Sequence, residues 1–196
     1  MPNYELLMET LKKNGYDVTF FPTAAQAVDY LDGEIDGRTV GSGGSMTIQE
    51  LGLLDRLSGH NTIVSHWKGD PVSAAMTTQV YLSSVNGLAE TGEIVNIDGT
   101  GNRVASTIFG HDVVYLIVGR NKIAPDYEKA LWRARNIAGP KNAQRLGKAT
   151  PCAARGDKCY DCDSPQRICR SLVTFWRKSG GIPKVEIVLV DEDLGY

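Results

Sequence analysis

The sequence predicts an α/β protein whose central sheet is mostly parallel and flanked by helices. Strand-like and helix-like segments alternate along most of the 196 residues, which is typical of an α/β layer fold. Two apolar runs, at residues 112–118 and 185–190, are nearly uninterrupted, as expected of parallel strands buried on both faces. The length suits one core. We therefore expect a single domain over residues 1–196, with a cysteine-rich loop at 151–170 inside it.

The first half of the chain begins with an amphipathic segment that ends at Asn14-Gly15, a common helix stop. Thr23 is placed to cap the next helix. The elements expected here are helices at 2–13, 23–31, 47–54 and from 70 onward, and strands at 17–21, 39–40 and 61–65. Residues 80–84 fit either a strand or the end of a helix.

In the second half, the turn at residues 98–102 suggests a hairpin of strands 93–97 and 104–108, an antiparallel insertion. A helix is expected at 126–137, because Gly139-Pro140 follows it as a stop signal. Ser164-Pro-Gln resembles the start of a last helix that would run to about 178 and carry Cys169.

Charge is distributed unevenly along the chain. The net charge of −2 does not favour nucleic acid as a partner, yet residues 129–178 hold twelve Lys or Arg and three Asp, a net of +9 against −11 elsewhere. This asymmetry suggests a basic surface for an anionic ligand, although a solvated basic face would look the same. No apolar run is long enough to span a membrane and no secretory signal is visible, so a cytoplasmic protein is expected.

A glycine-rich segment, Gly41-Ser-Gly-Gly-Ser-Met-Thr47, lies between an expected strand and a helix. Glycines let a ligand approach the backbone, and free N–H groups at a helix start attract anions. The segment is neither a P-loop nor a dinucleotide fingerprint, so it implies no nucleotide cofactor. An ordinary capped turn is the alternative. The residues expected to bind a ligand here are Gly43, Gly44, Ser45 and Thr47.

A second group of charged residues surrounds the glycine turns between residues 88 and 103. A carboxylate beside turn N–H groups can act as a base or a nucleophile, although it more often caps the turn. We expect Asp98 and Arg103 to bind the ligand, and Glu90 to be a catalytic candidate. His60 and His66 flank an expected strand and are interpreted as strand-end histidines.

Three segments together resemble the lactate-utilisation (LUD) domain family: Gly-Gly-Ser-Met-Thr at 43–47, Ala-Glu-Thr-Gly-Glu-Ile at 89–94 and Ile-Ala-Gly-Pro-Lys-Asn-Ala at 137–143. The resemblance spans nearly the whole chain, and the order and spacing also match. It implies a fold similar to ribose-5-phosphate isomerases and CoA transferases, in which ligands sit over glycine-rich strand-to-helix turns. Folds of this kind often pair, so a homodimer is also expected.

The resemblance also implies residue roles and partners. Thr91 and Gly92 would share the ligand-binding role of the first turn, and Glu90 would lie in the loop that corresponds to the acidic catalytic loop of CoA transferases. In multi-subunit systems the LUD domain occurs beside iron–sulfur proteins that oxidise lactate to pyruvate. Iron–sulfur oxidoreductase subunits are therefore expected partners. The chain departs from the small LUD subunit by its four cysteines near the C-terminus.

Residues 133–148 carry five basic side chains and no acid between them: Arg133, Arg135, Lys141, Arg145 and Lys148. A carboxylate, a phosphate or a CoA tail could be held there by charge-assisted hydrogen bonds. The preference of helix ends for cations explains only the first two. Lys141 is accordingly the second catalytic candidate.

All four cysteines fall within eighteen positions and read C-x6-C-x2-C-x6-C: Cys152, Cys159, Cys162 and Cys169. Without a secretory signal, such clustering favours metal ligands over disulfides. Four thiolates suit a structural zinc ion or a [4Fe–4S] cluster, and the spacing selects neither. Free reduced thiols are the third alternative.

Three functions remain open from the sequence. The first is a lactate or related organic-acid utilisation protein that binds a small anionic ligand as part of an oxidoreductase assembly. The second is a stand-alone transferase or isomerase that handles a CoA-type or phosphorylated ligand through Glu90 and Lys141. The third is a non-enzymatic metal or redox sensor, in which the cysteine loop acts.

Overall fold

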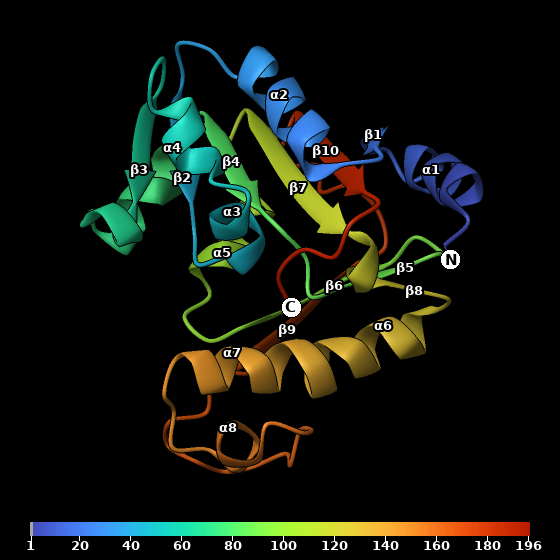
Figure 1. Cartoon of the computed structure of the whole chain (residues 1–196), viewed down its shortest axis with the longest axis vertical. Coiled ribbons are helices and arrows are strands. Elements are labelled where there is room, and N and C mark those ends of the chain that lie inside the picture. Colours follow the sequence, from blue (N-terminus) through green and yellow to red (C-terminus); the bar gives the residue numbers. More distant parts are fainter. Residues whose placement is uncertain (1) are drawn as a thin grey trace.

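The computed structural model describes residues 2–196 and contains two β-sheets with helices around them (Figure 1). The larger sheet has six strands in the order β1-β10-β7-β4-β2-β3, and all its pairs are parallel. This confirms the predicted parallel central sheet. Its strands are β1 (Asp17–Phe21), β2 (Thr39–Ser42), β3 (Thr62–Ser65), β4 (Val80–Ser83), β7 (Val113–Gly119) and β10 (Lys184–Val190).

Both faces of the larger sheet are covered, which explains its continuous apolar strands. Val114, Leu116 and Val118 of β7 pack on the side of α1 (Tyr4–Lys13), whereas Tyr115 and Ile117 face the other helices. This division follows from the alternation of side chains along a strand. The helices packed on the second face are α2 (Ala24–Glu34), α3 (Met46–Glu50) and α4 (Leu53–Leu57). Two 3-10 segments, η1 (His66–Lys68) and η2 (Val72–Thr77), connect β3 to β4.

The smaller sheet has the strand order β8-β5-β6-β9, in which β6 pairs antiparallel with both of its neighbours. Its strands are β5 (Gly87–Ala89), β6 (Ile94–Asp98), β8 (Ile123–Ala124) and β9 (Ser171–Phe175). It packs on α6 (Tyr127–Arg133) through small side chains, mainly alanines. A Cβ atom on Gly87 would stand 2.5 Å from the carbonyl oxygen of Ala130, so the close approach of helix and sheet requires glycine there.

The helix predicted at 126–137 continues past its expected stop. After α6 the chain forms a π-helical turn, η4 (Ala134–Ala138), and then α7 (Gly139–Arg145), with Pro140 in the first turn of α7. The wider π turn changes the hydrogen-bonding register ahead of the proline, whose missing N–H and ring would otherwise break the helix. A short helix, α8 (Pro151–Arg155), follows and is capped by Thr150.

Two sequence predictions were wrong. Residues 104–108 do not form a strand, because α5 (Asn102–Ser106) begins there, and β6 pairs instead with β5 and β9. Residues 164–178 do not form a helix: they contain an irregular segment and then β9, so Cys169 lies just before a strand. Pairing with β6 along its full length overrides the local helix-start signal. The ambiguous residues 80–84 are strand β4 and its end.

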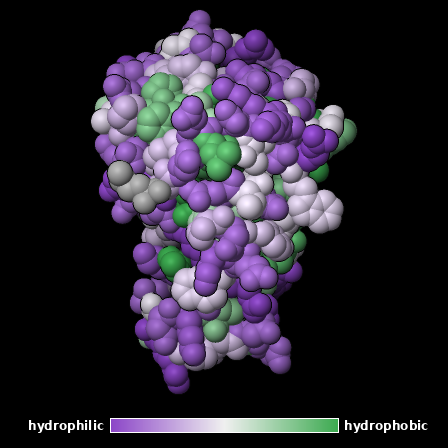
Figure 2. Space-filling model, turned by 90° about the vertical axis from the view of Figure 1, so that its right-hand side faces the viewer, coloured by the Kyte–Doolittle hydropathy of each residue, from purple (hydrophilic) through white to green (hydrophobic). Residues whose placement is uncertain are grey.

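Several large apolar side chains are exposed at the surface. The face in Figure 2 is mostly hydrophilic, and its hydrophobic residues occur in separate small patches. Within residues 2–196, no helix combines the length and apolar character that a membrane crossing requires.

Candidate functional site

A cavity of about 850 Å³ opens at the carboxyl ends of the parallel strands. Gly44 and Ser45 follow β2, His66 follows β3, Ser84 follows β4, and Lys122 follows β7. Open α/β sheets bind ligands in this position, because the loops after neighbouring strands converge there. Four loops far apart in sequence thus contribute to this cavity, which we call the strand-end cavity. The turn at 97–103, α7, residues 165–170 and Tyr196 also line it.

The glycine-rich turn forms one wall of the strand-end cavity. Ser45 caps α3, since its hydroxyl accepts a hydrogen bond from the Ile48 N–H at 3.5 Å. Gly44 lies against the His66 ring, whose nearest carbon would be 3.8 Å from an added Cβ atom. Gly43 is not a cavity-lining residue; a Cβ there would meet the Tyr81 hydroxyl at 2.7 Å. Glycine at 43 is thus explained by packing, and Gly44 and Ser45 are the residues that a ligand could touch.

Lys122 is the most unusual group in the cavity. Its side chain is buried, and its ammonium donates to the Thr47 hydroxyl at 2.7 Å and the Ser84 hydroxyl at 2.9 Å. Across residues 2–196, no carboxylate lies within salt-bridge distance of Lys122. Burial lowers the pKa of Lys122 to about 7, with Arg133 and Arg103 lowering it further and Glu50 opposing them. An ammonium with this pKa titrates near neutral pH, and the protein supplies no carboxylate as its counter-ion.

Thr47, predicted to touch the ligand, is fully buried and acts through Lys122. Its hydroxyl accepts from that ammonium and donates to the carbonyl oxygen of Leu194 at 3.3 Å. The segment after β10 is thus fixed against α3, where the Gly195 N–H also donates to a Glu50 carboxylate oxygen at 2.6 Å. From this segment, Tyr196 lines the cavity.

Arg103, predicted to bind the ligand, lines the cavity, but its guanidinium is already occupied by protein acceptors. Nη1 donates to the Asn96 side chain at 2.8 Å and to the Ser84 carbonyl at 3.2 Å, and Nη2 donates to the Asn86 side chain at 3.0 Å and the Ile97 carbonyl at 2.7 Å. Burial lowers the pKa of Arg103. Its role is to fix the cavity wall and supply positive potential.

Asp98 also lines the cavity and is committed to the turn. Its two carboxylate oxygens accept hydrogen bonds from the N–H groups of Thr100, Gly101 and Val104 at 3.0–3.1 Å. Asp98 therefore stabilises the turn that leads into α5, whose N-cap residue is Gly101, and through Val104 it also contacts the first turn of that helix. Its carboxylate lies 3.9 Å from Arg103 Nε and offsets part of that charge.

A third buried cation, Arg133, does not line the cavity but adds to the positive charge near Lys122. It donates from Nε to the Asn121 carbonyl and from Nη1 to the Asn86 carbonyl, both at 2.6 Å. Burial lowers the pKa of Arg133 to about 10. Around the opening, further basic side chains line the cavity: Arg145, Lys148, Arg167 and Arg170. The cavity is thus strongly electropositive.

Four predicted site residues lie elsewhere. Glu90 accepts a hydrogen bond from the Asn3 N–H at 2.8 Å, at the start of α1. Thr91 donates to Glu93, and Gly92 takes a positive φ beside Asn14. Lys141 is exposed on α7 and lines neither of the two cavities described in this section. The structure does not bring these residues together with the strand-end cavity, and catalytic roles for Glu90 and Lys141 stay predictions.

Sequence reasoning missed Lys122, Ser84 and Asn86. Lys122 comes three positions after the buried strand β7, which ends at Gly119. The signal available in the sequence was positional, since polar residues just after parallel strands face a common edge. His66 directly follows the strand β3, begins η1 and also lines the cavity.

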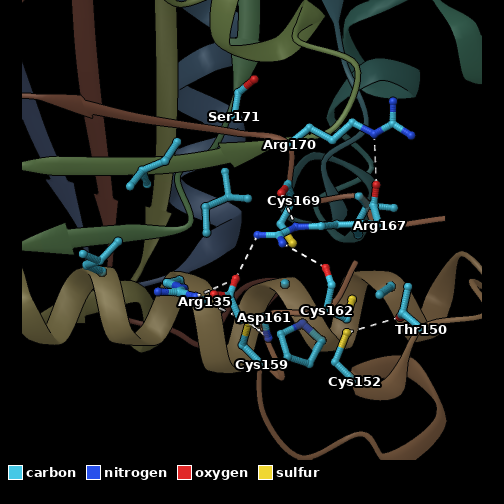
Figure 3. A pocket seen from close by; sticks show the side chains of 17 residues that line it. Arg135, Thr150, Cys152, Cys159, Asp161, Cys162, Arg167, Cys169, Arg170 and Ser171 are labelled. Carbon is cyan, nitrogen blue, oxygen red and sulfur yellow. Dashed lines mark hydrogen bonds and ion pairs between the residues drawn. The ribbon is translucent and has the colours of Figure 1, made fainter. Parts of the chain in front are cut away.

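The four cysteines line a second cavity, of about 330 Å³ (Figure 3). It lies between α7 and the irregular segment before β9, and we call it the cysteine cavity. Cys152 belongs to α8, and its sulfur is 3.3 Å from the Thr150 hydroxyl. Cys159 Sγ accepts a hydrogen bond from the Asp161 N–H at 3.3 Å. All four thiols are free and half-buried.

The fold of a solved structure agrees with this architecture over nearly the whole chain. A DUF162 family protein from Deinococcus radiodurans, known from its crystal structure, matches with a TM-score of 0.57 and 12% identity, over 95% of each chain. A ribose 5-phosphate isomerase from Plasmodium falciparum overlaps 52% of each chain, with 12% identity and a TM-score of 0.34. No curated protein matches the sequence. The sequence model of the LUD domain matches residues 4–190. The chain therefore belongs to the LUD domain family, which supports a role related to lactate utilisation.

Proposed function

We propose that the chain binds a small organic acid in the strand-end cavity, with a carboxylate beside Lys122, as a component of an oxidoreductase assembly for lactate or a related acid. The observation that carries the proposal is the uncompensated positive charge. Lys122 is buried with two hydroxyl partners, and Arg103 and Arg133 are buried nearby. An incoming carboxylate would supply the missing counter-charge and form charge-assisted hydrogen bonds.

The groups around Lys122 also suit a hydroxy or keto acid. The ammonium and the Ser84 hydroxyl lie 2.9 Å apart and could contact a carboxylate and a neighbouring oxygen. His66 also lines the cavity and offers a further hydrogen-bonding side chain to a ligand. Because Lys122 titrates near pH 7, it can hold the anion when charged and accept a proton when neutral.

Calorimetric titration with lactate and with pyruvate tests the proposal. We expect Lys122→Met to weaken binding at least tenfold, about 1.4 kcal/mol, since it removes the charge while keeping most of the buried volume. The matched control is Lys129→Met, because Lys129 is exposed on α6 and lines neither cavity. Unchanged affinity in Lys122→Met would overturn the assignment, as would absence of binding to the native protein.

The organic-acid role is tested separately in the host cell. Deletion of the gene should reduce growth on lactate or a related acid as carbon source, and the gene carrying Lys122→Met should not restore it. Normal growth of the deletion strain on every such acid would overturn the metabolic part of the proposal. Anion binding would still be decided by the calorimetric titration.

A second candidate, a stand-alone enzyme for a CoA-type or phosphorylated substrate, is favoured by the basic opening. Arg145, Lys148 and Arg170 line a cavity much larger than a three-carbon acid needs. Coenzyme A would then bind more tightly than lactate, and Arg145→Ala with Lys148→Ala would weaken coenzyme A alone. Equal loss for both ligands, or no binding of coenzyme A, would contradict this candidate.

A further inference from the structure

We propose that the cysteine cavity is the binding site of a [4Fe–4S] cluster held by Cys152, Cys159, Cys162 and Cys169. The sequence alone left zinc, an iron–sulfur cluster and free thiols open. The structure adds the shape of the cavity, the contacts of the sulfurs and the charge around them, and these observations favour the cluster.

The first argument is the arrangement of the thiols. All four line one cavity of about 330 Å³, although they come from α8, the irregular segment and the residue pair before β9 (Figure 3). A zinc ion with Zn–S bonds of about 2.3 Å would hold its four sulfurs about 3.8 Å apart. Within residues 2–196, no group of three or more Cys, His, Asp or Glu side chains is placed to hold a single metal ion. Thiols spread around a common space suit a cubane, which is several ångströms across.

The second argument is the local geometry of the Cys159–Cys162 pair. Asp161 is the non-glycine residue with a positive φ, +46°, among the described residues. This conformation directs its N–H to Cys159 Sγ, at 3.3 Å. Left-handed backbone is uncommon outside glycine, and Asp is among the residues that tolerate it. N–H donors to sulfur stabilise cluster thiolates and tune their potential.

The third argument is charge. A [4Fe–4S]²⁺ core with four thiolates is dianionic, and three arginines line the cavity: Arg135, Arg167 and Arg170. Arg135 also lies 3.9 Å from Cys159 Sγ. Asp161 pairs with Arg135 at 3.3 Å and with Arg167 at 3.2 Å, and so balances part of this charge. The positive charge that remains would offset the negative charge of the cluster and its four thiolates.

The fourth argument is that hydrogen bonds fix the backbone of the cysteine residues that would bind the cluster. Arg167 donates to the carbonyl oxygens of Cys162 and Cys169, both at 2.9 Å. The segment 156–170 contains neither helix nor strand. A segment of that length without regular structure is uncommon unless it is functional. Apolar side chains, among them Ile97, Leu131 and Pro140, line the other side and would limit the access of water.

The cluster would lie at the wall of the strand-end cavity. Cys169 lines both cavities, together with Arg167, Ile168 and Arg170. The residue after Arg170 begins β9 and pairs with Asp98, whose turn lines the strand-end cavity. This proximity places a centre capable of one-electron transfer beside the proposed anion site, independently of whether that site binds lactate.

The test is to purify the full chain without oxygen, before and after reconstitution with ferrous iron and sulfide. We expect about four iron and four sulfide per chain, and a broad absorption near 400 nm that dithionite bleaches. Cys162→Ser should lose most of the iron, whereas Asp163→Asn should keep it, because Asp163 is exposed and lines neither cavity.

Two results would overturn the proposal. One is a colourless protein that retains no iron or sulfide after reconstitution and shows four titratable thiols. The other is about one zinc per chain without sulfide, which would indicate a structural zinc site. If Cys162→Ser fails to fold, by far-UV circular dichroism, chelation of iron from the native protein gives the same readout. Calorimetry on Lys122 remains a separate test of the proposed function.

Discussion

The strand-end cavity and the cysteine cavity lie side by side but are built differently. The first is assembled from loops fixed by a six-stranded sheet, and each buried cation there already has protein hydrogen-bond partners. The second depends on residues 156–170, which have no regular structure and are held by side-chain contacts, among them those of Arg167 and Asp161. A rigid scaffold can preform an anion site, whereas an irregular segment needs a bound group to become equally ordered.

The largest expected effect separates the two regions by amide hydrogen exchange. In Cys159→Ser with Cys162→Ser, the amides of residues 156–170 should exchange at least tenfold faster than in the cluster-loaded native protein, because the cross-link between α8 and β9 is lost. Amides of β4 and β7 should be unchanged. Asp163→Asn serves as the control. Equal exchange of residues 156–170 in all three proteins would show that a bound group contributes nothing to their order.

A second prediction concerns the contact between the two regions. A Cβ atom on Gly99 would stand 2.5 Å from the carbonyl oxygen of Ile168, next to Cys169. Gly99→Ala should therefore displace the cysteine segment, destabilise the fold by about 1–3 kcal/mol and reduce both iron content and anion affinity. Gly59→Ala, where the added methyl group meets open space, is the control. Chemical denaturation with iron analysis measures both effects. A change in iron content without any change in anion affinity would show that the regions are independent.

The parallel sheet was predictable because burial on both faces leaves a direct trace in the sequence. The apolar runs at 112–118 and 185–190 correspond to β7 and β10. The glycine-rich turn after a strand predicted a ligand site near Gly44; a cavity lies there, and ligand binding stays a prediction. These inferences depend on local patterns that the sheet preserves.

The errors come from contacts between distant segments. Residues 171–175 became a strand because β6 offered five paired positions, a fact that their own sequence does not contain. Lys122 carries no local sign of burial; it is buried because the segment around Leu194 folds over Thr47. Glu90 resembled a catalytic residue in its motif, yet its nearest partner is the first turn of α1. Tertiary structure decides such cases.

A third prediction uses the pKa of Lys122. Its folded value of about 7 lies below its unfolded value of about 10.4, so between these values the unfolded chain binds the additional proton. The free energy of unfolding of the anion-free protein should therefore rise with pH over this window, by at most about 1.4 kcal/mol per pH unit. Lys122→Met should lack this rise. Anion affinity should move in the opposite direction and fall above pH 7, because the ligand prefers the charged amine.

Denaturation and calorimetry at pH 6.5, 7.5 and 8.5 check both slopes, with Lys129→Met as the control. A native protein whose pH dependence of stability equals that of Lys122→Met would show that Lys122 is charged throughout, and that its buried charge is compensated. In the cysteine region the same pH series should have little effect on a loaded cluster, which sharpens the contrast between the two sites.

The smallest expected effect concerns Glu90, whose motif suggested catalysis. Its carboxylate accepts a hydrogen bond from the Asn3 N–H, at a partly exposed position beside α1. Glu90→Gln keeps an acceptor oxygen there and should lower stability by less than about 1 kcal/mol. Because Glu90 lines neither cavity, lactate affinity and iron content should stay within twofold of the native values. A large loss of coenzyme A transfer in Glu90→Gln, with binding and stability preserved, would instead favour the transferase candidate and require the loop after β5 to reach the substrate by a movement of α1.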